Sequence, residues 1–212
     1  MESQGEIDKL REGAQCVVIR CMEPSMNTPG AQRRIDGVLE PILREHGIRI
    51  DAGQKKLPRW LKDRFQLPGI VRCYGERFLD DAFGRVVEYG LDLAVAAHGV
   101  EMVVIIEHTN CGERNIQFRK RFKRGPTKEE ELLLMLSALN KSERRIQDWY
   151  ASRPHTGTLH VAKMVATVTA SHIAAQRRMD ALLTLEEYLE QSPALSESTP
   201  LADGLHLGML TG

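Results

Sequence analysis

One histidine and two cysteines have the residue types and the spacing that suit a metal site. His108 and Cys111 are three residues apart and come just after the apolar run Met-Val-Val-Ile-Ile at residues 102–106. Cys21 ends an earlier run, Cys-Val-Val-Ile-Arg-Cys at residues 16–21. Two thiolates and one imidazole suit Zn²⁺, and a set of three leaves the fourth position for water or a further ligand. These three residues therefore form a candidate zinc site.

Two apolar strands must bring these residues together. Apolar β-branched runs alternate with amphipathic stretches along the chain, which predicts an α/β fold. In an open parallel sheet, ligand sites lie beyond the carboxyl ends of the strands. If the strands at residues 16–21 and 101–106 are neighbours, then Cys21, His108 and Cys111 converge at one edge of the sheet.

The remaining pattern completes a mostly parallel sheet of four or five strands flanked by helices. Further strands are expected at residues 69–75 and 161–169. Helices are expected at residues 31–45, 76–98 and 175–191, and one long helix is entered through Pro126 and Thr127. We expect a single domain over residues 1–212, with a leading helix within residues 1–14 and a flexible tail at residues 192–212.

The composition is that of an ordinary globular protein. Of the 212 residues, 42% are hydrophobic and 27% are charged, which excludes a disordered, collagen-like or disulfide-dense chain. Lys and Arg total 29, as do Asp and Glu, so no bulk charge attracts nucleic acid or an anionic membrane. With neither a secretory signal nor a membrane-spanning run of about 20 apolar residues in view, we expect a cytoplasmic protein. In that reducing compartment, Cys16 and Cys73 are expected to be buried thiols.

The residues around the two predicted strand ends resemble those of the β-class carbonic anhydrases. The chain has Cys-Met-Glu-Pro-Ser at residues 21–25, where that family has Cys-Met-Asp-Ser-Arg. It has His-Thr-Asn-Cys-Gly at residues 108–112, where the family has His-Thr-Asp-Cys-Gly. The resemblance covers residues 15–115, about half the chain. It implies that Cys21, His108 and Cys111 hold Zn²⁺ in a β-carbonic-anhydrase-like fold.

The resemblance also implies a function and an assembly. The expected reaction is reversible hydration of carbon dioxide to bicarbonate, with these small molecules as the partners and no nucleic acid or membrane. Zinc would make hydroxide available near neutral pH. The expected assembly is a homodimer or a higher homo-oligomer.

Two substitutions within the motif bear on the catalytic role of Glu23. In the family, an aspartate orients the zinc-bound water, and an arginine two positions later holds that aspartate away from the metal. Here Glu23 replaces the aspartate and Ser25 replaces the arginine. Glu23 would either orient the nucleophile or ligate zinc itself, and Arg20, Arg72 and Arg114 are candidates for holding it off the metal.

Several alternatives stay open at this point. A site closed by Glu23 would make the chain a non-catalytic zinc protein that binds a partner. An altered pocket would make it a hydrolase of a carbon dioxide analogue such as carbonyl sulfide or carbon disulfide. His108 and Cys111 are also a possible base and nucleophile. The basic run at residues 119–124 is expected to be a solvated helix face, and the alternative is a docking surface for an anion or a partner.

Overall fold

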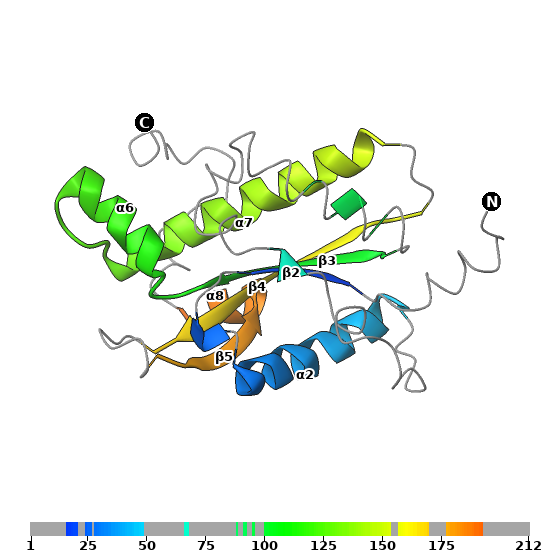
Figure 1. Ribbon diagram of the computed structural model, residues 1–212, viewed down its shortest axis with the longest axis horizontal. Coiled ribbons are helices and arrows are strands. Elements are labelled where there is room, and N and C mark those ends of the chain that lie inside the picture. The colour runs from blue at the N-terminus through cyan, green and yellow to red at the C-terminus, as the bar shows by residue number, and fades with distance from the viewer. Residues whose placement is uncertain are drawn as a thin grey trace.

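A single mixed sheet with helices on both sides forms the core of the computed structural model (Figure 1). The structure describes residues 16–20, 24–26, 28–48, 66–67, 88, 91–92, 95, 100–153, 157–169 and 177–192. The strands, in chain order, are β1 (Val17–Arg20), β2 (Gln66–Leu67), β3 (Met102–His108), β4 (His160–Val168) and β5 (Met179–Thr184). They lie in the order β2-β1-β3-β4-β5. The pairs β1–β2, β1–β3 and β3–β4 are parallel, and β4–β5 is antiparallel.

The two central strands are buried on both faces, which explains their continuous apolar runs. Every residue of β1 and β3 is buried. Side chains alternate between the faces of a strand, so Val103 and Ile105 join one apolar cluster while Val104 and Ile106 join the other. The helix α7 (Lys128–Ala151) covers the first face and α2 (Pro29–Glu45) covers the second (Figure 1).

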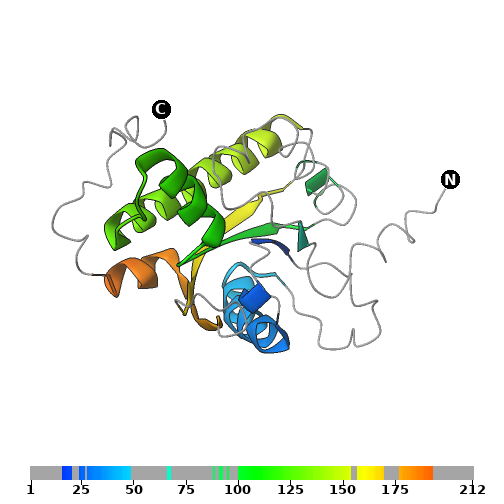
Figure 2. The same ribbon diagram turned by 60° about the vertical axis from the view of Figure 1, so that its left-hand side comes forward.

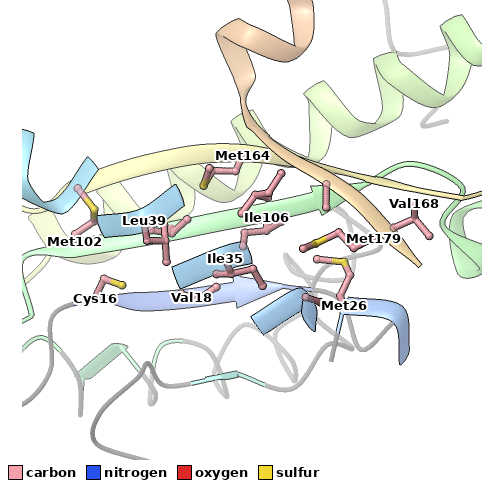
Figure 3. Close-up of a cluster of buried hydrophobic side chains, with 14 of the residues drawn as sticks. Cys16, Val18, Met26, Ile35, Leu39, Met102, Ile106, Met164, Val168 and Met179 are labelled. Atoms are coloured by element: carbon pink, nitrogen blue, oxygen red, sulfur yellow. The ribbon is translucent and has the colours of Figure 1, made fainter. Parts of the chain in front are cut away.

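The helix α2 has clear start and stop signals in the sequence. The Thr28 hydroxyl accepts a hydrogen bond from the backbone N–H of Ala31, and Pro29 occupies the first turn. The helix ends before Gly47, whose φ of +70° is a conformation that glycine adopts readily. Figure 3 shows Ile35 and Leu39 of α2 within a buried apolar cluster on this face of the sheet, which includes four methionines: Met26, Met102, Met164 and Met179.

Two helices follow β3. The first, α6 (Gly112–Phe122), begins directly beyond the end of the strand, and α7 runs back along the sheet (Figures 1 and 2). Thr127 and Glu130 form a capping box at the start of α7, since the side chain of each accepts a hydrogen bond from the backbone of the other. The expected long helix entered through Pro126 and Thr127 is thus confirmed.

The helix predicted at residues 175–191 is confirmed only over its last part and is wrong over residues 179–184. Residues 179–184 form strand β5, and within the described part of this segment only α8 (Leu185–Glu190) is helical. The free edge of β4 offered backbone hydrogen-bonding groups that β5 satisfies, and this tertiary pairing overrode the local helical pattern. Thr184 and Glu187 then form a capping box that starts α8 at the end of the strand.

The other predicted strands and helices divide into confirmed segments and segments outside the described residues. The strand at residues 161–169 and the helix at residues 31–45 are confirmed as β4 and α2. The leading helix, the strand at residues 69–75 and nearly all of the predicted tail lie outside the described residues, as does most of the helix at residues 76–98. Within the described ranges, no helix has the length and apolar character needed to cross a membrane.

Candidate functional site

Strands β1 and β3 are neighbours and parallel, as the candidate zinc site requires. Their register pairs Val17 with Val103 and Arg20 with Ile106, so both strands run toward the same edge of the sheet. His108 is the last residue of β3. Cys21 and Glu23 lie outside the described residues. The described part of the candidate site is therefore the end of β3, the turn after it and the start of α6.

The His108 side chain is fully buried, and one of its ring nitrogens has a defined partner. Its Nδ1 lies 2.9 Å from the carbonyl oxygen of Thr109, and a carbonyl can only accept a hydrogen bond. Nδ1 must therefore carry the hydrogen, so in the neutral ring Nε2 carries the lone pair. A histidine that binds a metal usually donates its other ring N–H to a carbonyl or carboxylate in this way. His108 thus has the tautomer that presents Nε2 as a ligand.

The turn after His108 is tied to the end of β4. Thr109 donates its backbone N–H to the carbonyl of Ala166, and its hydroxyl accepts from the backbone N–H of Val168 at 2.9 Å. The Asn110 side chain donates to the carbonyl of Val168 at 2.7 Å. Asn110 has a φ of +57°, a left-handed conformation that asparagine tolerates better than most residues. These contacts explain why Thr and Asn occupy the two positions between His108 and Cys111.

Cys111 is buried at the N-terminal end of α6. It is the N-cap residue of that helix and is 1% exposed. It belongs to the apolar cluster on the α2 face of the sheet, together with Cys16. Among the described residues, no disulfide joins these two cysteines. A buried thiol packs well in such a cluster, and the positive end of a helix dipole also stabilises an anionic sulfur that binds a metal.

A buried ion pair lies beside this turn. Nη2 of Arg114 is 2.5 Å from Oε2 of Glu107, and the two side chains are 4% and 2% exposed. Nη1 of Arg114 donates to the carbonyl of His108 at 3.2 Å and lies 3.8 Å from Oε1 of Glu131 on α7. Burial raises the pKa of Tyr188 on α8, and the negative charge of Glu131 raises it further. Charged side chains from three elements therefore meet at the end of β3.

The three arginines proposed to hold Glu23 have different surroundings. Arg72 lies outside the described residues. Arg114 contacts the carboxylates of Glu107 and Glu131. Arg20 is 3% exposed, and its Nη1 donates to the carbonyl of Met26 at 2.8 Å, within the 3-10 helix η1 (Pro24–Met26) that follows Glu23. Burial lowers the pKa of the Arg20 guanidinium.

Sequence reasoning missed the role of Glu107. A single acidic residue at the end of an apolar strand, just before His108, is the signal that was available. A carboxylate in such a place requires a positively charged partner because an unpaired buried charge is costly. The sequence offers several arginines nearby and does not indicate which of them turns toward Glu107.

The basic run at residues 119–124 lies at the surface. Arg119, Lys120 and Arg121 are exposed, and Arg124 forms two hydrogen bonds with Glu130, at 2.6 and 2.7 Å. Cations near the end of a helix are stabilised by its dipole. These side chains have the exposure expected of a solvated helix face.

The described side chains alone do not complete a metal site. In the described part of the chain, no group of three or more His, Cys, Asp or Glu residues could hold a metal ion, and Cys21 is outside that part. No family model matches the chain, and no curated protein or solved structure gives a significant match. Only the residues themselves and their surroundings therefore bear on the function of this chain.

Proposed function

We propose that this chain is a zinc-dependent enzyme that reversibly hydrates carbon dioxide to bicarbonate, with Cys21, His108 and Cys111 as the zinc ligands. The observation that carries the proposal is the 2.9 Å contact between Nδ1 of His108 and the carbonyl oxygen of Thr109, from which the Nδ1–H tautomer is inferred. His108 lies at the end of a strand that pairs in parallel with the strand preceding Cys21. The proposal includes a mostly parallel sheet of the β-carbonic-anhydrase type, a homodimer and a cytoplasmic location.

The donor atoms fit zinc better than they fit a harder metal. Magnesium and calcium prefer oxygen ligands, whereas thiolates and imidazoles select zinc and related borderline metals. The carbonyl of Thr109 orients the His108 ring, as outer partners of metal ligands do. Cys111, at the N-terminus of α6, is in a position where a thiolate is stabilised.

Zinc held by three protein ligands supplies a hydroxide nucleophile near neutral pH. In the proposed mechanism, the Glu23 carboxylate would accept a hydrogen bond from the nucleophile and would set its direction. Arg20, whose guanidinium donates to the Met26 carbonyl of η1, is a candidate for holding Glu23 off the metal. Cys111 lies in an apolar cluster, where electrostatic interactions are stronger than in water.

The test is zinc content measured together with stopped-flow hydration of carbon dioxide. Cys111→Ser should lose zinc and nearly all hydration activity. Cys16→Ser is the matched control because Cys16, which directly precedes β1, is also buried in the same apolar cluster. It should keep both. Equal zinc content and equal rates in the two variants would contradict the proposal.

A zinc-replete protein without hydration activity would change the conclusion in a defined way. It would favour a site closed by Glu23, or a different substrate such as carbonyl sulfide. Glu23→Ala separates these outcomes. An orienting glutamate would lose activity and keep its metal, whereas a ligand glutamate would bind zinc less tightly when replaced.

A further inference from the structure

Arg114 lies where it can control the geometry of the turn that carries His108 and Cys111. It is the third residue of α6, and Glu107 and His108 are the last two residues of β3. The guanidinium contacts both of these strand residues. One side chain therefore connects the two ends of the turn.

Pairing with Glu107 accounts for the charge of Arg114, but the helix dipole and burial both disfavour a cation at this position. The first turn of a helix carries the positive end of the helix dipole, which disfavours arginine. Burial adds a desolvation cost, since the Arg114 side chain is 4% exposed. Apolar side chains of similar volume are often at least as stabilising as a buried ion pair. The directional hydrogen bonds of Arg114 are what an apolar side chain could not supply.

Those hydrogen bonds act on the backbone next to the His108 ring. Arg114 donates to the carbonyl of His108, which orients the peptide unit between His108 and Thr109. The next carbonyl, that of Thr109, accepts from Nδ1 of His108. If the first peptide unit rotates, the acceptor that selects the tautomer of His108 moves with it.

We propose that Arg114 is a positioning residue of this site: it clamps the Glu107 side chain and the His108 carbonyl to α6, and so holds His108 and Cys111 in a ligating arrangement. The inference rests on the proposed function, because it concerns the same site. Replacement of outer residues that orient metal ligands typically weakens metal binding about 10- to 100-fold.

The first experiment measures zinc affinity in the full chain by competition with a chelating indicator. Arg114→Met should bind zinc about 10- to 100-fold more weakly than the wild type. Arg114→Lys should recover part of this loss, since lysine keeps a donor and a charge but not the planar fork. Arg121→Met, which removes an exposed arginine of the same helix, should bind zinc as the wild type does.

A second control separates positioning from general destabilisation. Leu139 of α7 lies in the apolar cluster on the face of the sheet opposite Cys111. Leu139→Ala creates a cavity there and should destabilise the fold without changing zinc affinity. All variants are compared under conditions where circular dichroism shows them folded. Wild-type affinity in folded Arg114→Met would overturn the inference.

The His108 tautomer provides a readout that does not depend on zinc. In the metal-free wild type, ¹⁵N NMR of the histidine rings should show the Nδ1–H form of His108, assigned by comparison with His108→Gln. In Arg114→Met, we expect a mixture of tautomers. An unchanged tautomer would overturn the role of Arg114, whereas a wild type that binds no zinc would overturn the proposed function. The two failures are thus distinguishable.

Discussion

Arg114 lies in the first turn of α6 and Arg124 lies just beyond the last turn, and the two pair with glutamates in opposite environments. Arg114 and Glu107 are almost completely buried, and their closest atoms are 2.5 Å apart. Arg124 is 53% exposed and its partner Glu130 is 21% exposed, although their closest atoms are 2.6 Å apart. Two ion pairs with similar distances therefore differ greatly in their burial.

The difference shows how burial changes the meaning of an ion pair. Water solvates and screens Arg124 when it separates from Glu130, so the surface pair contributes little. Glu107 has no such access to water, because every residue of its strand is buried. Removal of its partner would leave a buried charge. The surface pair serves a local helix cap, whereas the buried pair joins a strand to a helix beside the candidate site.

The largest predicted effect comes from breaking the buried pair. Arg114→Met should lower the free energy of unfolding by about 3–5 kcal/mol, because it leaves the Glu107 carboxylate buried without this partner. Urea denaturation followed by circular dichroism measures the change. Arg124→Met is the matched exposed control and should leave the urea midpoint nearly unchanged.

A double replacement sharpens this prediction. Glu107→Leu combined with Arg114→Met removes both charges, and the double variant should recover most of the stability lost by Arg114→Met alone. It should not recover zinc affinity if Arg114 positions the ligands. Equal destabilisation by Arg114→Met and Arg124→Met would remove the distinction between the two pairs.

An intermediate effect is expected at the cap next to the exposed pair. Thr127→Ala should lower the free energy of unfolding by about 1 kcal/mol, because the backbone N–H of Glu130 loses its side-chain acceptor. Thr127→Ser keeps the hydroxyl and should keep most of the stability. Thermal unfolding of the two variants would measure the difference, and equal losses would argue against the cap.

The smallest effect concerns the pH dependence of the exposed pair. Hydrogen bonds from Arg124 and from the Thr127 backbone lower the pKa of Glu130 from its ordinary value of 4.5 to about 2. Because the pKa of Glu130 is lower in the folded state, its ionised carboxylate stabilises the fold at pH values above 4.5. This contribution disappears as the pH falls from 4.5 toward 2. Solvent screening limits the contribution of Glu130 to about 1 kcal/mol at most.

Comparison of the wild type with Glu130→Gln tests the predicted direction of this pH dependence. The stability difference between them should be larger at pH 6 than at pH 3, measured by thermal unfolding in matched buffers. A difference that grows as the pH falls would contradict the predicted direction.

The sequence alone predicted the elements whose signals are local. The apolar runs of β1, β3 and β4 and the apolar stripes of α2 and α7 are confirmed by the structure. Capping residues such as Thr28 and Thr127 lie at the helix starts because their hydroxyls satisfy backbone groups within three residues. His108 and Cys111 could be identified as candidate site residues for the same reason, since both closely follow the apolar run at residues 102–106.

Only the tertiary structure decided the features that join distant residues. The segment at residues 179–184 became a strand because β4 had an open edge, despite its expected helical period. The adjacency of β1 and β3, on which the candidate site depends, required a pairing between residues more than 80 positions apart. Arg114 was chosen as the partner of Glu107 by burial and geometry, since charge alone does not distinguish it from the neighbouring arginines. Local propensity cannot encode such choices because their energies arise only when the sheet and helices pack together.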